Sequence, residues 1–508
     1  MKVADFIVST LVSQGVDRIY GITGDSLNSI TDSVFKHKSL QWIHTRHEEA
    51  AAFAAGADST VTNQLTVCAG SSGPGNLHLI NGLYDCQRNK SPVLAIAAQI
   101  PSTEIGSEYF QETDPRHLFK GCSVFCETIS RPDQAHRILS MAIQCAREKR
   151  GVSVVIISGD IADLPFKNHV SQNLSTFNLP SVTASSEDIH ELTQILNSSK
   201  KITLFCGYGC ADARDEILEI ASKLQSPIVH SLRAKEFIEH DNPFDVGMTG
   251  FIGFSAGYSA MHYADVLIIL GSSFPYRQFY PKTCKIIQVD LDPSQLGRRT
   301  PISLGIIGSV KHTLRQLMPF VKQKDDKKFL NQSCKHYINS RVSLSKSATI
   351  DKSSHKIHPQ MVFKLISDFA NDNAIFTCDV GTPTVWSARY LSLSGDRRLL
   401  GSFNHGSMAN ALSQGIGAQC ADLDRQVIAL CGDGGFSMLM GDLLTLKQHE
   451  LPLKVLVLNN RSLGFVELEM KANGFLDNAT QLENPDFSDV ANSCAISGFS
   501  VKNAQDLE

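Results

Sequence analysis

The sequence lacks long hydrophobic runs and an excess of charge of one sign, and each absence excludes a class of protein. No stretch approaches the ~18 to 20 consecutive apolar residues that a membrane-spanning helix needs. The 47 Lys and Arg residues are mixed with 51 Asp and Glu residues, and the formal net charge is −4. Such a chain offers no basic stripe for a phosphate backbone, so we expect no nucleic-acid partner.

Cysteine frameworks and a secretion signal are also missing. The 13 cysteines are an odd number, and Cys122/Cys126 and Cys206/Cys210 each lack a second pair at zinc-finger spacing. The start, MKVADFIVSTLVSQG, interrupts its apolar residues with Asp5 and has no small-residue cleavage site. These features predict reduced cysteines in a cytoplasmic protein.

What is present is a long chain that needs more than one hydrophobic core. At 508 residues it exceeds the usual size of a single domain. Polar stretches at residues 167–187 and 322–360 divide it, and we expect three domains, 1–180, 181–335 and 336–508.

Short apolar runs indicate the fold class. Short Val-, Ile- and Leu-rich runs at 154–157, 265–270 and 454–458, the second led by Asp265 and the third by Lys454, are typical of parallel strands buried on both faces. We therefore expect an α/β protein with three doubly wound parallel-sheet domains. The first and third domains are expected to be alike, because GSSGPGN and GSFNHGSMAN are each followed 17 residues later by a strand-like run.

The stretch CGDGGFSMLMGDLLTLKQHELPLKVLVLNN has polar residues at the end of two apolar runs. Gly432-Asp433-Gly434 ends the first and Asn459-Asn460 the second, with 24 residues between Gly434 and Asn459. Ligands of open α/β sheets bind at the carboxyl ends of strands, and carboxylate and amide oxygens suit Mg²⁺. The stretch predicts a diphosphate held through magnesium, although such residues are also typical of plain turns.

This paired motif resembles the signature of thiamine-diphosphate (ThDP) enzymes, in which the positions of Asp433 and Asn460 bind the Mg²⁺ that anchors the cofactor. The resemblance extends through GITGDSLNS, TRHEEAAAFAAGA, GSSGPGNLHLINGLYDC, EYFQETDP, MTGFIGFS, SSFPYR, CDVGTPTVW, GSFNHGSMAN and NNRSLGFVELEMKA. Together these segments are similar to the pyruvate oxidase family of FAD- and ThDP-dependent enzymes, which implies the ThDP-enzyme fold.

The family requires a glutamate, from the other α/β domain of a partner subunit, that holds a proton at N1′ of the aminopyrimidine. TRHEEAAAFAAGA supplies Glu48 ahead of the small residues 50–57, which allow close helix approach. Glu48 and Glu49 point about 100° apart on a helix, so only one faces the cofactor, and the resemblance selects Glu48. Without that context the pair would be a solvated helix N-terminus.

The resemblance assigns further positions around ThDP. Met408 resembles the apolar support that bends the cofactor, and Phe110 and Gln111 match a pair that reaches the active site from the first domain. Phe465 resembles an aromatic residue near the route between the cofactors, although plain packing explains it as well. The remaining ThDP positions are Val380, Gly381, Thr382, Gly406, Ser407, Gly434, Gly435, Arg461, Ser462, Leu463, Gly464 and Val466.

The middle domain has a weaker motif. KITLFCGYGC leads into Gly207-x-Gly209, but Asp212 stands where a nicotinamide Rossmann site has Gly or Ala. The resemblance implies FAD instead, with Asp290 at a strand end where a carboxylate suits ribose hydroxyls or adenine. The other FAD positions are Thr249, Gly250, Phe251, Ile252, Ser272, Ser273, Phe274, Pro275 and Tyr276.

The resemblance implies a reaction and its partners. Pyruvate would be oxidatively decarboxylated to acetate and CO₂, with electrons passing through FAD to a membrane quinone such as ubiquinone. One alternative is an oxidase that uses oxygen and phosphate, and another is an acetolactate synthase-like enzyme with a structural FAD. A third alternative is an inactive remnant that binds nucleotides or subunits without turnover.

The family also implies a homo-oligomer, usually a tetramer, with active sites between subunits. It associates peripherally with the inner face of the cell membrane through an amphipathic C-terminal segment. The sequence ends at KNAQDLE, where the family continues with a helix, another strand and that segment. We therefore expect an exposed sheet edge in the third domain.

Overall fold

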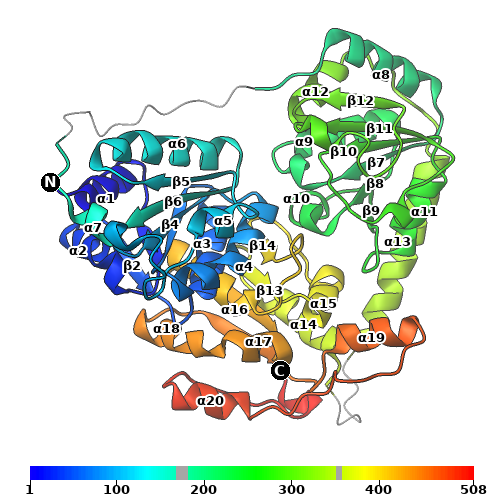
Figure 1. The fold of residues 1–508 in the computed structure, drawn as a ribbon. Helices are drawn as coiled ribbons and strands as arrows, with labels where there is room; N and C mark the ends of the chain where they lie inside the picture. Colours follow the sequence, from blue (N-terminus) through cyan, green and yellow to red (C-terminus); the bar gives the residue numbers. More distant parts are fainter. Residues whose placement is uncertain (168–180, 350–356, 508) are drawn as a thin grey trace. The chain divides into compact units, whose positions relative to one another are not determined.

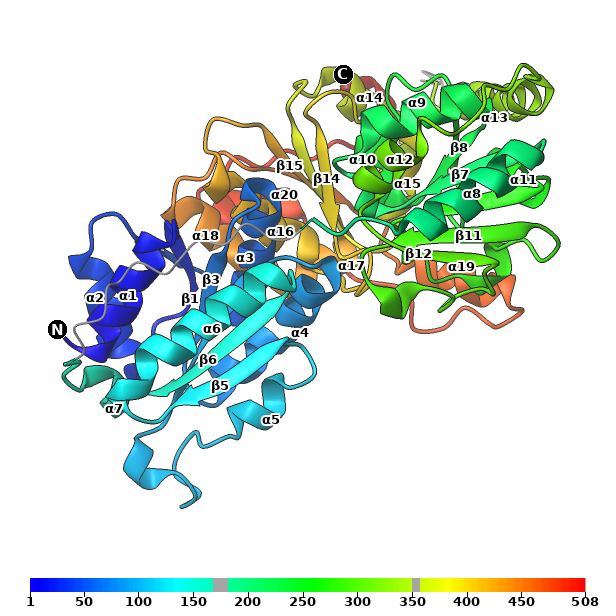
Figure 2. The ribbon, with the colours of Figure 1, turned by 90° about the horizontal axis from the view of Figure 1, so that it is seen from above.

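The computed structural model describes residues 1–167, 181–349 and 357–507. The chain divides into two compact units, whose elements are labelled in Figure 1 and seen from above in Figure 2. Unit 1 comprises Met1–Asn178, Asn373–Thr384 and Leu399–Ser500; unit 2 comprises Leu179–Asp372, Val385–Arg398 and Val501–Glu508. Unit 1 holds two parallel sheets and unit 2 holds one, which confirms the expected α/β fold with three sheets.

The first sheet has the strand order β2-β1-β3-β4-β6-β5, with parallel pairing throughout. Its strands are β1 (Arg18–Gly21), β2 (Gln41–His44), β3 (Thr66–Gly70), β4 (Val93–Gln99), β5 (Phe125–Ile129) and β6 (Val152–Ser158). The helices of this domain are α1 (Val3–Ser13), α2 (Asn28–Lys36), α3 (Glu48–Thr62), α4 (Pro74–Asn89), α5 (Pro115–Phe119), α6 (Ala135–Glu148) and α7 (Gly159–Asp163).

Helices cover both faces of this sheet, which explains its continuous apolar strands. On one face Phe6 of α1, Ile30 of α2 and Leu139 of α6 belong to a single core cluster, and Figure 1 shows α6 running beside β5 and β6. On the other face α3 and α4 contribute buried residues such as Leu79 and Leu83. Strands β4 and β6 are consequently buried along their whole length.

The second sheet of unit 1 has the strand order β14-β13-β15-β16. Its strands are β13 (Ile375–Cys378), β14 (Arg398–Gly401), β15 (Val427–Gly432) and β16 (Lys454–Leu458). The helices that follow these strands along the chain are α16 (Asn410–Ala421), α17 (Asp433–Leu439), α18 (Leu443–Gln448), α19 (Gly464–Ala472) and α20 (Phe487–Ser493). Helix α15 (Thr382–Tyr390) begins in unit 1 and continues into the Val385–Arg398 range of unit 2. This second-first-third-fourth order repeats the first four strands of the first sheet, as the sequence echo predicted.

The two sheets of unit 1 differ at the fourth strand. Strand β4 pairs onward with β6 and is fully buried, whereas β16 is the last described strand of its sheet. Residues 455–458 of β16 are only half-buried, and Lys454 is exposed. Strand β16 is therefore less buried than β4, its counterpart in the first sheet.

Small residues let three helices of unit 1 approach closely. A Cβ atom at Gly82 of α4 would lie 2.5 Å from the Cβ of Ala52 in α3. A Cβ atom at Gly417 of α16 would overlap the carbonyl oxygen of Ala54 in α3. The predicted function of residues 50–57 in close helix packing is confirmed.

The sheet of unit 2 has the strand order β12-β11-β10-β7-β8-β9. Its strands are β7 (Ile202–Cys206), β8 (Ile228–His230), β9 (Asp245–Met248), β10 (Val266–Leu270), β11 (Lys285–Asp290) and β12 (Leu304–Ile307). The helices of this unit are α8 (Ser186–Ser198), α9 (Arg214–Leu224), α10 (Lys235–Ile238), α11 (Ser255–His262), α12 (Val310–Leu317), α13 (Lys328–Ser347) and α14 (Pro359–Phe369). The order of the strands reverses between β7 and β10, where nucleotide sites form in such sheets.

The second polar stretch, residues 322–360, contains the long helix α13. This helix buries Leu330, Ser333 and Tyr337, and the Tyr337 ring packs edge-on against Phe254, 5.3 Å between centroids. The boundary that we placed at 335/336 falls inside α13, because its few buried positions are hidden among polar residues. The boundary at 180/181 adjoins residues 168–180, which lie outside the described residues.

All 13 cysteines are free thiols, as expected for a chain without a disulfide framework. Across the described ranges, we find no helix with the length and apolar character needed to cross a membrane.

Candidate functional site

Asp433 begins α17 directly after β15 and lies against the turn that follows β16. Its Oδ2 accepts hydrogen bonds from the backbone N–H of Arg461 (2.6 Å) and from Nδ2 of Asn484 (2.9 Å). Its Oδ1 accepts the N–H of Gly434 at 2.9 Å. Burial raises the pKa of Asp433. The two predicted magnesium ligands, Asp433 and Asn460, are therefore carried by neighbouring turns at the carboxyl ends of paired strands.

The glycines at these turns are closely packed, so a side chain at either position would clash with its neighbours. A Cβ atom at Gly434 would lie 2.7 Å from Cδ2 of Leu463 and 3.2 Å from Cε of Met408. A Cβ atom at Gly464 would lie 3.5 Å from Cγ2 of Thr382 and 2.8 Å from Nδ2 of the predicted asparagine ligand. The structure thus gathers predicted cofactor positions from four separate segments around the metal turn.

Glu48 occupies the first turn of α3 and is only 6% exposed. Its Oε2 pairs with Nδ1 of His78 at 2.9 Å. A Cβ atom at Gly75 would lie 3.1 Å from its Oε1. The carboxylate of Glu48 therefore lies beside the first turn of α4, held by a histidine one turn further along.

Glu49 has a different set of partners. Its Oε1 accepts a hydrogen bond from Nδ2 of Asn81 (2.7 Å), and the same nitrogen donates to Oγ of Ser407 (2.9 Å). Oδ1 of Asn81 pairs with Nε2 of His405 at 2.8 Å. Asn81 thereby joins the helix of Glu48 to the predicted turn at 406–408. The origin of the glutamate in a partner subunit stays a prediction.

The Phe110-Gln111 loop rests on the turn that precedes α4. Oε1 of Gln111 accepts the hydroxyl of Ser72 at 3.1 Å, and a Cβ atom at Gly73 would lie 2.9 Å from the carbonyl oxygen of Gln111. The Phe110 ring is 77% exposed. Gln111 thus lies over the same end of α4 as Glu48.

The other predicted ThDP positions lie on the loops and helix starts of the same sheet. Val380 and Gly381 connect β13 to α15, Gly406 lies between β14 and α16, Gly435 is in α17, Ser462 precedes α19, and Phe465 and Val466 are in its first turn. Phe465 is half-buried there.

Four polar residues of this region were missed from the sequence. His78 and Asn81 follow the Gly-Pro-Gly turn by one and two helical turns, so their helical spacing was a usable signal. Asp379 immediately precedes the predicted 380–382 segment, and burial raises its pKa to about 7. Asn484 lies 24 residues beyond Asn460 in a segment without regular structure, and no pattern pointed to it.

The described residues fit ThDP and Mg²⁺. Asp433 offers carboxylate oxygens at a strand end and Asn460 an amide oxygen on the adjacent turn, a hard donor set that suits Mg²⁺. The absence of a side chain at Gly434 lets Leu463 and Met408, two of the predicted cofactor positions, pack directly on the turn that follows Asp433. Glu48 is an acid whose burial suits contact with a ring nitrogen.

The predicted FAD positions of unit 2 converge at the carboxyl edge of its sheet. The Gly207-x-Gly209 turn after β7 packs on Gly271 after β10, with the N–H of Gly209 donating to the carbonyl of Gly271 at 2.9 Å. A Cβ atom at Gly207 would lie 2.5 Å from the Cβ of Ser272. This close approach lies where the strand order reverses, which is the expected place for a nucleotide.

Thr249 supports a ligand at this edge. Its hydroxyl is buried and has no hydrogen-bond partner among the described residues, so a bound polar group would satisfy it. Gly250, with φ 107°, carries the chain into Phe251, whose exposed ring packs 4.8 Å from that of Tyr276. Asp290 ends β11 and accepts the N–H of Asp292 at 3.0 Å. These residues fit FAD.

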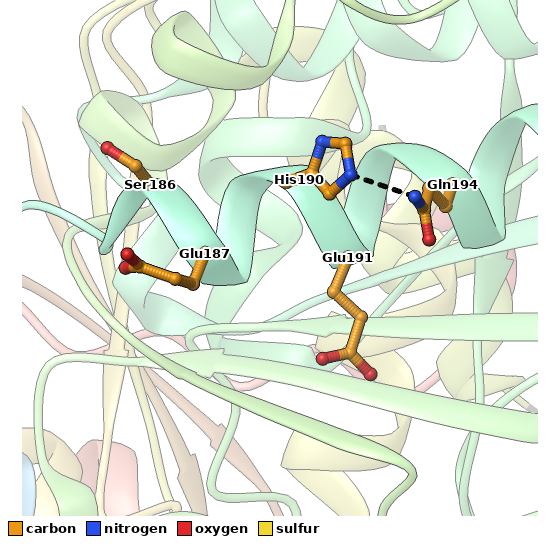
Figure 3. A pocket seen from close by; sticks show the side chains of 5 residues that line it. All are labelled: Ser186, Glu187, His190, Glu191 and Gln194. Atoms are coloured by element: carbon orange, nitrogen blue, oxygen red, sulfur yellow. Dashed lines mark hydrogen bonds between the residues drawn. The ribbon is translucent and has the colours of Figure 1, made fainter.

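A shallow pocket elsewhere in unit 2 contains no predicted site residue. It lies on the outer face of α8, and Figure 3 shows its lining side chains rising from this one helix, Ser186, Glu187, His190, Glu191 and Gln194. Within the pocket, Nε2 of Gln194 and Nε2 of His190 form a hydrogen bond of 2.8 Å. All of its lining residues belong to α8, and none belongs to the turns that carry the predicted FAD positions.

Three family models match this chain. They are the N-terminal TPP binding domain (residues 1–118), the central domain (189–317) and the C-terminal TPP binding domain (379–508) of thiamine pyrophosphate enzymes. Thiamine pyrophosphate is the same compound as ThDP. The three ranges follow the order of the three sheets along the chain.

Individual relatives span nearly the whole chain. The putative thiamine pyrophosphate-containing protein YdaP of Bacillus subtilis (strain 168) is 36% identical over 508 residues, all of this chain and 88% of that protein. Pyruvate oxidase of Lactiplantibacillus plantarum is 28% identical, covering 99% of this chain and 84% of that protein. Acetolactate synthase isozyme 1 large subunit of Escherichia coli (strain K12) is 28% identical, covering 91% and 82%. The chain therefore belongs to the thiamine pyrophosphate enzyme family.

Proposed function

We propose that this protein is a pyruvate dehydrogenase (quinone), which converts pyruvate, water and a quinone into acetate, CO₂ and the quinol. The observation that carries the proposal is that two acidic residues of unit 1, Asp433 and Glu48, are each held in a fixed position by their neighbours. Asp433 is held against the turn of Asn460, and Glu48 is buried beside the first turn of α4. Asp433 corresponds to the metal end of one ThDP site and Glu48 to the pyrimidine end of another, because we propose that each site forms between two subunits.

Bound ThDP supplies the electron sink for decarboxylation of a 2-oxo acid. Asp433 and Asn460 would hold the Mg²⁺ that anchors the diphosphate. Glu48 holds a proton at N1′ of the aminopyrimidine, and His78 fixes the orientation of its carboxylate. Met408 supports the cofactor from its apolar side, and Gln111 approaches from the turn before α4.

FAD in unit 2 is the proposed electron carrier. The unpartnered hydroxyl of Thr249 and the close contact of Gly207 with Ser272 support a nucleotide at that edge. A quinone, ubiquinone in particular, is the proposed final acceptor, with the protein associated peripherally with the inner face of the cell membrane. We also propose a homotetramer, because the family forms its sites between subunits.

Other acceptors are supported by the relatives. Pyruvate oxidase and acetolactate synthase relatives are equally identical to this chain, at 28%. Transfer to oxygen with phosphate would give acetyl phosphate, and addition to a second 2-oxo acid would leave the flavin oxidised. An inactive protein that only binds cofactors is the remaining alternative.

One anaerobic experiment separates these functions. Pyruvate is added to purified protein with ThDP and Mg²⁺, and the flavin absorbance is followed. Bleaching supports an oxidase, retained colour with acetolactate formation supports the synthase, and neither change supports the inactive protein. Reoxidation by a ubiquinone analogue, compared with oxygen with and without phosphate, then identifies the acceptor. Glu48→Gln should abolish the bleaching, and unchanged bleaching would refute the role of Glu48.

A further inference from the structure

Asp379 is a buried acid at the point where the strand order of the second sheet of unit 1 reverses. Asp379 directly follows β13, and the strand order reverses between β13 and its paired neighbour β15. The residue is 1% exposed. Ligands of open parallel sheets bind outside the strand ends at such a reversal, so Asp379 lies directly beneath the proposed cofactor site.

Its carboxylate adds to other bonds between the same segments, which include the pairing of β13 with β15 and the hydrogen bond from Nδ2 of Asn410 to the carbonyl oxygen of Cys378 (2.9 Å). Oδ1 of Asp379 accepts the backbone N–H of Ala411 at 3.0 Å, and Oδ2 accepts the N–H of Gly432 at 3.1 Å. Its carbonyl oxygen accepts the hydroxyl of Thr384 at 2.7 Å. Each of these three partners lies within three residues of a proposed ThDP or Mg²⁺ contact.

We infer that Asp379 is a positioning residue that holds the Met408 turn, the Asp433 turn and the 380–382 segment at the spacing required by Mg²⁺ and ThDP. It does so through two backbone hydrogen bonds and does not touch the cofactor itself. The inference rests on the proposed ThDP site and adds to it the residue that sets its geometry.

Gly435 gives independent support from packing. A Cβ atom at Gly435 would overlap Oδ2 of Asp379, and it would lie 3.1 Å from the backbone nitrogen of Ala409. The position of Asp379 is therefore sufficient to explain why residue 435 is a glycine. A contact of Gly435 with the diphosphate is not needed for this explanation. Any larger residue at 435 would push the carboxylate away from the N–H of Gly432.

Asp379→Asn tests the two hydrogen bonds with little change in volume. An amide has one oxygen, so one of the two N–H groups, of Ala411 or of Gly432, would face an NH₂ donor. Hydrogen bonds to charged groups are worth more than neutral ones, and misplaced ligands weaken binding further. We expect the affinity for Mg²⁺ and ThDP to fall about tenfold or more.

The measurement is a calorimetric titration of the full chain with ThDP at saturating Mg²⁺, together with FAD content and melting temperature. Weaker ThDP binding by Asp379→Asn with retained FAD supports the inference, and unchanged ThDP affinity overturns it. Asp58→Asn is the matched control, since Asp58 is equally buried in unit 1 but bonds Arg18 and Tyr20. An equal loss of ThDP affinity in the control would also overturn the inference.

A double-mutant cycle provides the second test, and if the Asp379 variants do not fold, an unchanged ThDP affinity of Gly435→Ala alone overturns the inference. Gly435→Ala should weaken ThDP binding in the wild type and cost less in an Asp379→Ala background, where the overlap is relieved. Additive losses would overturn the inference. A wild-type protein that binds ThDP but leaves pyruvate unchanged would refute the pyruvate reaction alone. A wild-type protein that does not bind ThDP would overturn both.

Discussion

His78 Nδ1 lies 2.9 Å from Oε2 of Glu48 and connects the first turns of α3 and α4. The His78 ring also stacks on that of His47, 4.4 Å between centroids, and His47 Nδ1 accepts the N–H of Glu49 at the start of α3. The proposed proton-holding carboxylate is thus fixed by a histidine pair rather than left free in solvent.

This arrangement predicts a graded loss of activity. His78→Phe keeps a ring for stacking but removes the partner of Glu48, so the carboxylate loses its fixed orientation. We expect the rate of flavin reduction by pyruvate to fall about tenfold, with ThDP affinity little changed. Stopped-flow bleaching at saturating ThDP measures it. A rate equal to wild type would show that the pair with His78 is unimportant.

At Gly417 of α16 we expect an alanine substitution to destabilise the protein, although alanine has the higher helix propensity. Alanine favours helices over glycine by about 1 kcal/mol, but its Cβ would overlap the carbonyl of Ala54 in α3. We expect Gly417→Ala to lower the free energy of unfolding by about 1 to 3 kcal/mol, because the overlapping atom is backbone and cannot move aside. Urea unfolding measures the change. Gly441→Ala is the control, since a Cβ atom there meets nothing within 4 Å.

Arg389 of α15 predicts an effect on FAD retention within unit 2. Its guanidinium donates to the carbonyls of Ile252 (3.3 Å) and Gly253 (3.0 Å), at the end of the proposed FAD loop. Arg389→Ala would release that loop, so we expect FAD to dissociate at lower temperature, detected by flavin fluorescence during heating. Arg315→Ala, which breaks an ion pair with Glu216 elsewhere in the unit, should leave the release temperature unchanged. Equal shifts in both variants would argue against the proposal.

Asp245 predicts a pH dependence of the stability of unit 2. Burial and the charge of Glu239 raise its pKa from 3.8 to about 8, against the lowering effects of the Gly247 N–H, Lys235 and Tyr337. The folded state therefore binds this proton more tightly than the unfolded chain. Its contribution is fully present below about pH 4 and is lost as the pH rises through about 8.

We therefore expect the free energy of unfolding to fall between pH 5 and 8, on the order of a few kcal/mol from this group. Asp245→Asn keeps an oxygen for the N–H of Gly247 and should flatten this fall. Asp241→Asn, at an exposed position nearby, should keep it. Urea unfolding across this pH range distinguishes the variants, and an unchanged slope for Asp245→Asn would contradict the prediction.

The amino-acid sequence by itself determined the fold class and marked the turn at which we propose the metal site. Continuous apolar runs are typical of parallel strands buried on both faces, and Gly-Asp-Gly and Asn-Asn place polar groups at the ends of two such strands, where ligands of open sheets bind. The small residues 50–57 likewise dictated close helix packing. The boundary at 335/336 could not be read in the same way, because α13 buries only three of its residues.

Only the tertiary structure decided which side chains support these groups. His78 meets Glu48, Asn81 meets Ser407, and Asp379 joins turns that are 32 and 53 residues away in sequence. Helical spacing could have marked His78 and Asn81, but no local pattern identifies the partners of these side chains, because the contacts depend on how helices and strands pack once the chain has folded. Periodicity and motif spacing describe which residues lie near one another within a single helix or strand. The partners named here belong to different elements, and only the packing of those elements brings them within hydrogen-bond distance.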